Sequence, residues 1–356
     1  MPDWTKSMQQ TFEYYIVDPG TWKDSKEIKN VKSCTINRDT SVSTLGSATI
    51  DVSEAIDECY VRIYLVTIQD GNRERFPLGT FLVQTPSSSH NGKTASISLD
   101  AYTPLLELKE NPPPLGYSIL KNSNVMEYVC ALTEEHARAP VVEVKTDDDI
   151  SNKLYYDFVA NTDDTWLTFL SDLMAYAKYS FDLDEMGRIL FAPKQDTASL
   201  QPVYTFTDGK NSIMYPDVDI DRDLYGIPNA VEVIYSNGSE SFYAKVVNDD
   251  DNSPISTINR GREILYRVPN PDFGGVPTEY QVKEYAEQLL RELSTLEYTI
   301  TYSHGYYPVR PNDCVRLNYE KAGLKNVKAK IISQTIKCVP GCPVTEKAVY
   351  TAKLWR

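Results

Sequence analysis

The segment 60–85, YVRIYLVTIQDGNRERFPLGTFLVQT, decides the fold class of this chain. Val61, Ile63 and Leu65 recur at every second position in its first half, which is the period of a β-strand. Gln69–Asn72 (QDGN) is a turn signal, and Phe76–Thr85 has the composition of a return strand. The segment therefore predicts a β-hairpin.

More short strands surround this hairpin. Alternating apolar residues predict strands at Cys34–Asn37, Ser47–Val52 and Thr94–Leu99, with a second turn at Ser87–Gly92. Five or more short strands at this spacing are typical of a small barrel or sandwich. The three prolines of Glu110–Pro114 can neither continue a helix nor donate to a sheet. We therefore expect a first β-barrel domain over residues 1–110.

The next part of the chain has a mixed pattern. Asn124–Ala137 carries apolar residues at helical spacing, and Trp166 begins a second apolar stripe after the acidic helix start at Asn161–Thr165. Tyr179–Leu183 and Arg188–Phe191 flank a turn and predict a hairpin. This pattern predicts an α+β middle domain over residues 111–200.

The third part returns to β-strands. Ala230–Tyr235 and Ser241–Val247 flank an Asn237-Gly238 turn, and Thr278–Gln281 is the capping box of a helix with an apolar face. The closing strands are predicted at Tyr298–Tyr302, Asp313–Asn318, Val327–Thr335 and Lys347–Leu354. We expect a second, similar β-barrel domain from residues 201–247 and 297–356. Residues 248–296 are expected to form a loop and a helix that packs with the middle domain.

Composition narrows the class of function. The chain has 356 residues with a formal net charge of −14, so it lacks the basic surface that holds nucleic acid. No apolar run approaches bilayer length, and the N-terminus lacks a secretory pattern, so we expect synthesis in a cytoplasm. In that compartment the six cysteines are expected to be reduced structural thiols. Cys338 and Cys342 are the one close pair, and could bridge a tight turn or supply half of a metal site.

One acidic pattern raises the question of a metal site. Asp217, Asp219, Asp221 and Asp223 fall at every second position, so in a strand their carboxylates point to one side. Arg222 stands where a calcium-binding loop needs glycine, which excludes the EF-hand. These aspartates face solvent or a partner, face a channel lumen, or bind a hard cation. We expect no metal site and no cofactor, and the four aspartates are the candidates that the pattern offers.

Other polar groups offer no recognisable catalytic motif. The acidic runs Asp147–Asp149 and Asn248–Asn252 have the composition of exposed loops. Of the three histidines, His90 and His304 fall in predicted turns, and His136 ends a predicted helix. None has a nucleophile partner, so we expect no enzyme, although a carboxylate-based glycosidase needs no local motif.

A set of segments in a fixed order resembles a known family. The segments are Phe76–Pro86 (FPLGTFLVQTP), Asp100–Leu108 (DAYTPLLEL), Thr165–Leu173 (TWLTFLSDL), Asp184–Pro193 (DEMGRILFAP), Pro228–Val233 (PNAVEV), Asn252–Ser256 (NSPIS) with Gly261-Arg262, and Pro308–Val315 (PVRPNDCV). Together they resemble the tail-tip or baseplate hub proteins of bacteriophages and related contractile injection systems. Asn312 stands where that family usually has glycine.

The resemblance implies a mainly β fold in which an α+β middle domain joins two similar β-barrels. It implies a homotrimeric ring that adapts a sixfold tail tube to a threefold tip and lets DNA pass without binding it specifically. The implied partners are the tail tube or distal tail protein, the tape-measure protein, and a spike, fibre or cell-wall-degrading tip component. The implied location is the virion tail tip or baseplate. The open alternatives are a hydrolase acting on cell-wall or surface glycans and a calcium-dependent carbohydrate-binding module.

Overall fold

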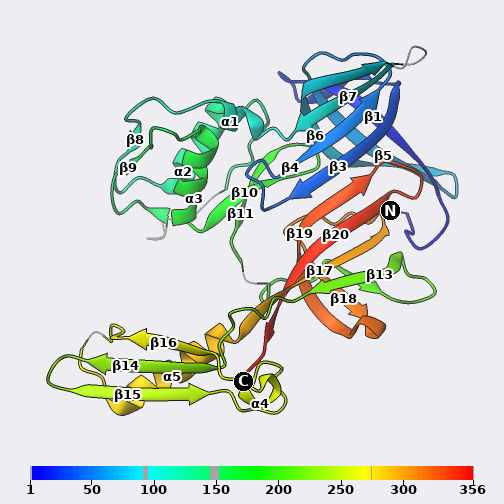
Figure 1. Cartoon of the computed structure of the whole chain (residues 1–356). Coiled ribbons are helices and arrows are strands. Elements are labelled where there is room, and N and C mark those ends of the chain that lie inside the picture. The colour runs from blue at the N-terminus through cyan, green and yellow to red at the C-terminus, as the bar shows by residue number, and fades with distance from the viewer. Residues whose placement is uncertain (1, 91–94, 145–151, 196, 274, 356) are drawn as a thin grey trace. The chain divides into compact units, whose positions relative to one another are not determined.

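The computed structural model describes residues 2–90, 95–144, 152–195, 197–273 and 275–355. The chain forms two compact units, Met1–Val218 with Thr301–Lys347, and Asp219–Ile300 with Ala348–Arg356. β-Strands dominate the first unit, and short helices accompany them (Figure 1). The predicted mainly β class with an α+β insertion is confirmed.

Seven strands form the N-terminal part of the first unit. They are β1 (Gln9–Asp18), β2 (Lys23–Glu27), β3 (Val31–Asp39), β4 (Gly46–Val52), β5 (Tyr60–Gln69), β6 (Asn72–His90) and β7 (Ala95–Tyr102). They pair antiparallel in the order β3-β4-β7-β6-β5-β1-β2. The predicted hairpin is β5–β6: Gln69 pairs with Asn72, and Asp70 and Gly71 between them both have positive φ, as a tight hairpin turn requires.

The C-terminal strands are joined to the N-terminal set through one strand pairing, which we did not expect. They are β12 (Tyr204–Thr207), β13 (Met214–Asp221), β17 (Thr295–Gly305), β18 (Cys314–Tyr319), β19 (Leu324–Lys337) and β20 (Pro343–Lys353). β19 pairs antiparallel with β3, and this pairing joins both sets into one 13-stranded sheet within the described residues. Ile336 of β19 lies opposite Ile36 of β3, and both are buried in the same core. Burial of these two side chains accounts for the joining of the sets.

The insertion between β7 and β12 has its own apolar core. Its elements are α1 (Leu106–Glu110), β8 (Ser118–Ile119), α2 (Val125–His136), β9 (Phe158–Val159), α3 (Trp166–Tyr176), β10 (Tyr179–Leu183) and β11 (Ile189–Pro193). Thr165 caps α3, since its hydroxyl accepts from the Thr168 amide at 3.2 Å, so the acidic residues that we expected in the first turn precede the helix. Phe169 and Leu173 of α3 are fully buried in this core. α3 packs against α2 and β10 (Figure 1).

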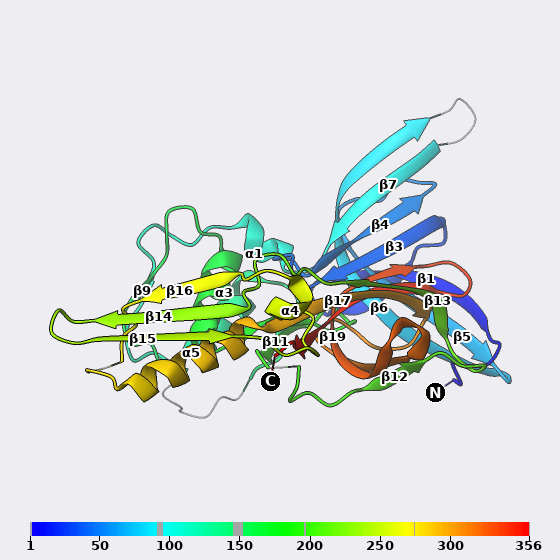
Figure 2. The same cartoon turned by 60° about the horizontal axis from the view of Figure 1, so that its bottom comes forward.

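The second unit is a three-stranded sheet covered on one face by a helix. β14 (Ala230–Ser236) lies between β15 (Ser241–Val247) and β16 (Leu265–Pro269), α4 (Thr257–Arg260) is short, and α5 (Glu279–Leu293) lies along the sheet (Figure 2). The Asn237-Gly238 hairpin and the Thr278–Gln281 capping box are confirmed. The apolar face of α5 packs on β14 and β15.

Two expectations about this unit are therefore wrong. The hairpin of residues 230–247 pairs with β16 and not with the second β set, and α5 packs on that hairpin where we expected the middle domain. The physical reason is that β14 carries apolar residues that pack in one cluster with those of α5, including Val231 and Val233. The sequence indicates such a face but not its cover.

Candidate functional site: the docked hairpin

The tip of the β10–β11 hairpin is held to the sheet by a set of polar contacts. Asp184 shapes the turn, because its side chain accepts from the Arg188 amide at 2.8 Å and its carbonyl accepts from the Gly187 amide at 2.9 Å. Gly187 has a φ of +75°. A β-carbon there would lie 2.6 Å from the Thr80 β-carbon of β6, so this turn docks on the sheet only with glycine at this position.

Arg62 of β5 holds the hairpin tip from inside the sheet. Its side chain is 1% exposed, and its Nε donates to the Thr80 hydroxyl at 2.9 Å. Nη1 donates to the Asp24 carboxylate at 2.9 Å, and Nη2 donates to the Met186 carbonyl at 3.0 Å. The Trp22 indole Nε1 donates to that same carbonyl at 2.8 Å. The buried charge is thus neutralised and multiply hydrogen-bonded, which makes it a rigid fastening.

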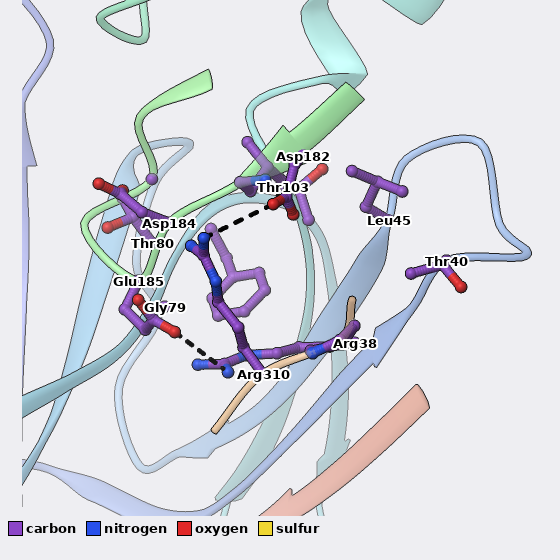
Figure 3. A pocket seen from close by; sticks show the side chains of 14 residues that line it. Arg38, Thr40, Leu45, Gly79, Thr80, Thr103, Asp182, Asp184, Glu185 and Arg310 are labelled. Atoms are coloured by element: carbon purple, nitrogen blue, oxygen red, sulfur yellow. Dashed lines mark hydrogen bonds and ion pairs between the residues drawn. The ribbon is translucent and has the colours of Figure 1, made fainter. Parts of the chain in front are cut away.

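Two more arginines flank the tip. Arg38 of β3 lies 3.5 Å from the Glu185 carboxylate, and Arg310, which follows β17, lies 3.7 Å from the Asp182 carboxylate (Figure 3). Burial raises the pKa of Asp182, and Arg310 offsets part of that effect. The cavity between these side chains is about 50 Å³. That is far below the several hundred Å³ typical of small-molecule sites.

A buried polar network continues from Arg38 into the C-terminal strands. Arg38 Nη1 donates to the Gln334 Oε1 at 3.1 Å, and Gln334 Nε2 donates to the Glu346 Oε1 at 2.6 Å. The Tyr302 hydroxyl donates to the other Glu346 oxygen, and His304 Nε2 lies 3.2 Å from Oε1. Burial, followed by Glu346, raises the pKa of Tyr302 well above its ordinary value. His304 and Glu346 are fully buried, so no substrate reaches this carboxylate.

The polar groups of the docked tip bind one another and hold the hairpin to the sheet. In the docked tip, each arginine faces a carboxylate or a carbonyl, and no hydroxyl or thiol is paired with a base as nucleophilic catalysis requires. A larger hollow of about 430 Å³ lies beside β2 and includes Cys59. Burial raises the pKa of that thiol to about 11, so it is protonated at neutral pH. Both regions therefore lack an activated nucleophile.

The four candidate aspartates lie on the surface. Asp217, Asp219 and Asp221 are exposed on β13 and alternate with the less exposed Val218 and Ile220. Asp223 lies beyond the end of the strand and accepts from the Tyr225 amide at 2.8 Å. In the part of the chain that the structure describes, no group of three or more His, Cys, Asp or Glu residues is arranged to hold a metal ion.

The histidines differ from their predicted settings in two cases. His304 lies within β17 and is buried, not in a turn, and His90 is the last residue of β6, also not in a turn. The end of β6 is polar and pairs with β7 through backbone hydrogen bonds. Such pairing needs no apolar side chains, so the sequence has no apolar pattern there that would indicate a strand. His136 ends α2 as predicted, and its ring stacks on Trp166 at 4.2 Å.

The predicted acidic loops have different outcomes. Asp147–Asp149 lies outside the described residues. In Asn248–Asn252 the first residue is fully buried, and its side-chain amide donates to Ser253 at 2.8 Å. This loop is therefore tied to the second unit and is not wholly exposed, because Asn248 and Asp250 also accept from backbone amides two residues on.

Sequence reasoning did not find the residues that build the docked tip. Arg62 is a lone charge within an apolar strand, and such a charge signals a buried partner. Nothing local identifies Asp24 or Met186 as that partner, because they belong to segments remote in sequence.

Comparisons with known proteins place this fold. No protein-family profile and no curated protein matches the sequence. Among solved structures, the tail protein from Neisseria meningitidis MC58 is similar with a TM-score of 0.60 and 13% identity, over 96% of each chain. The 43 kDa tail protein of prophage MuSo2 from Shewanella oneidensis is similar with a TM-score of 0.59 and 12% identity, over 96% of this chain and 98% of that one. Prophage tail protein gp18 from Listeria monocytogenes EGD-e is similar with a TM-score of 0.51 and 14% identity, over 94% of each chain.

These likenesses define the class of fold: the chain has the fold of phage tail proteins along nearly its whole length. The structural resemblance predicted from the ordered segments is thus confirmed at the level of fold. Among the described residues, no helix is long and apolar enough to cross a membrane.

Proposed function

We propose that this protein is a structural component of a phage tail, the hub of its tip or baseplate, without catalytic activity. The observation that carries the proposal is the shared fold with the Neisseria meningitidis tail protein over 96% of both chains. A likeness that spans the whole chain supports a common role better than one confined to a single domain. The rigid fastening of the middle hairpin to the sheet suits a part that transmits load.

Three copies of the chain form a closed ring that joins the sixfold tail tube to a threefold tip. In a cyclic trimer, one face of each copy meets a different face of its neighbour. The net charge of −14 and the exposed aspartates of β13 keep DNA from adhering as it passes. The neighbours are the tail tube or distal tail protein, the tape-measure protein, and a spike, fibre or cell-wall-degrading component.

Native mass spectrometry of the purified chain at micromolar concentration tests this proposal. We expect a species of three times the 40.3 kDa chain mass, alone or after addition of the cognate tail-tube protein. Negative-stain images of that species are expected to show a ring with a central channel. A chain that stays monomeric under both conditions overturns the proposal.

Two further measurements separate the alternatives. Cleavage of purified cell wall that a single carboxylate substitution abolishes would establish a hydrolase in place of the hub. A calcium-dependent rise in melting temperature that Asp219→Asn removes would establish a cation-dependent binding module. We expect neither effect.

A further inference from the structure

Two buried cysteines lie opposite each other where the N-terminal and C-terminal strands meet. Cys34 belongs to β3, and Cys338 immediately follows β19. Lys337 pairs with Thr35 in the antiparallel register, so the next opposite pair is Cys338 with Cys34. The Cys338 amide donates to the Cys34 carbonyl at 2.9 Å, which extends the pairing to these two residues.

The two thiols lie in the same apolar core. Their residues are 2% and 7% exposed, respectively, and both belong to the same buried cluster. The neighbouring Cys338 side chain and burial raise the pKa of the Cys34 thiol. A hydrogen-bonded antiparallel pair places its α-carbons about 5.5 Å apart. Disulfides span roughly 4.4–6.8 Å between α-carbons, so the backbone spacing suits a bond.

We propose that Cys34 and Cys338 are a redox site, which hydrogen peroxide converts into a disulfide joining β3 to the end of β19. All six thiols are unbonded in this structure. The inference does not depend on the proposed function, since it rests on the strand register and on the burial of both thiols in one cluster.

The reaction balances with peroxide as the two-electron oxidant. Cys338 is the more exposed of the two and is reached first, and its sulfur attacks one peroxide oxygen. The O–O bond breaks, giving a sulfenic acid and one water. The Cys34 sulfur then attacks the sulfenic sulfur, the S–O bond breaks and a second water leaves with the thiol proton. Two thiols and one peroxide thus become one disulfide and two waters. Hydrogen peroxide is small enough to enter a nearly closed site, whereas a bulky disulfide such as oxidised glutathione is too large to reach the buried thiols.

Cys342 offers two rival pairings, with Cys338 and with Cys34. Cys342 lies four residues after Cys338 and belongs to the same buried cluster. The Cys342 amide donates to the Val339 carbonyl at 2.8 Å, so the chain turns tightly between them. The sequence pattern alone favours that close pair, and the strand register favours Cys34.

Trypsin mapping separates the Cys338–Cys342 pairing from a bond to Cys34. The native protein is incubated with peroxide, quenched with N-ethylmaleimide in urea at mildly acidic pH, and digested without reductant. Cleavage after Lys32, Arg38, Lys337 and Lys347 puts Cys34 in one peptide and both Cys338 and Cys342 in another. We expect the two peptides to be cross-linked, with one maleimide on the second and full release by dithiothreitol.

Matched variants identify the sulfurs. Cys342→Ser is expected to retain the cross-link and Cys338→Ser to lose it. The oxidised wild type is expected to melt several degrees higher than the reduced protein, and to migrate faster on a non-reducing gel, because the bond closes a loop of most of the chain. A disulfide between Cys338 and Cys342 within the second peptide overturns the proposal. Full alkylation of both peptides after prolonged oxidation of the native protein overturns it as well. Fragmentation of the cross-linked wild-type peptides shows whether the maleimide is on Cys342 or on Cys338, and this decides the pairing even where a variant fails to fold.

Discussion

At the scale of single residues, Asn312 shows how a departure from a familiar pattern is accommodated. It stands where similar proteins are expected to have glycine, and its φ is +75°. Asparagine enters the left-handed region more readily than other non-glycine residues. The Asn312 amide donates to the Ile331 carbonyl at 2.8 Å, so the turn keeps its pairing with β19.

Substitution of Asn312 isolates the cost of this backbone conformation. Asn312→Gly and Asn312→Ala both lose the side-chain amide, but only alanine is strained at positive φ. We expect the alanine variant to be less stable than the glycine variant by about 1 kcal/mol in urea unfolding. Equal stabilities would contradict the conformation assigned to this turn.

The contribution of Asp182 to the stability of the fold depends on pH. Burial raises its pKa above the ordinary 3.8, so the folded state holds the proton more tightly than the unfolded chain. Asp182 therefore contributes stability below about pH 3.8 that is lost as the pH rises through the raised pKa. Asp182→Asn keeps an acceptor for the Leu183 amide but cannot ionise.

We expect the stability of Asp182→Asn relative to wild type to rise over that pH range and then level off. Urea unfolding followed by tryptophan fluorescence at a series of pH values measures it. Asp217→Asn, on the exposed face of β13, is the control for loss of one charge. A constant difference at all pH values would show that the Asp182 carboxylate gains as much from Arg310 as it loses by burial.

At the scale of elements, docking of the β10–β11 hairpin depends on the close approach at Gly187. Gly187 and Gly116 both have a φ of +75°, but only Gly187 faces a neighbour, Thr80. Alanine costs the same backbone strain at both positions, and at Gly187 it adds a clash. We expect Gly187→Ala to lose about 1–3 kcal/mol more than Gly116→Ala in chemical unfolding. Equal losses would show that the tip moves freely from β6.

Local elements of this fold were predictable, and their partners were not. The β5–β6 hairpin, the Asp184–Gly187 turn and the α5 capping box follow from signals within a few residues. The pairing of β19 with β3 has no such signal, because it depends on burial of Ile336 beside Ile36. For the same reason the β14–β15 hairpin was predicted correctly and assigned to the wrong sheet. The docked tip was missed because Arg62 and Met186 meet only in the folded chain.

At the scale of the whole molecule, the joint between the two strand sets is reinforced by a buried amide. Gln334 of β19 accepts from Arg38 of β3 and donates to Glu346 of β20. Leucine at this position would remove a hydrogen-bond partner from Arg38, from Glu346 and from the Val309 carbonyl inside the protein. We expect Gln334→Leu to lose about 2–4 kcal/mol of unfolding free energy.

The neighbouring Thr335 provides a matched control for that change. Its hydroxyl also bonds across the joint, to the Asn37 side chain at 2.9 Å, but on the solvent-accessible side. Thr335→Val is expected to cost about 0.5 kcal/mol or less, because water replaces the lost partner. Similar losses in both variants, measured by urea unfolding, would show that burial of the Gln334 amide adds nothing to the joint.

The β19–β3 pairing also has a consequence for synthesis of the chain. Thr335 and Asn37, which meet across it, are 298 positions apart. At roughly 5–20 residues per second, a ribosome needs roughly 15–60 s to make the second strand after the first. For that time β3 of the nascent chain has no partner on one edge, and an unpaired edge is a template for association with other chains. Crowded translation of this protein therefore favours aggregation between nascent chains, and a chaperone that covers β3 until β19 emerges would raise the yield of folded protein.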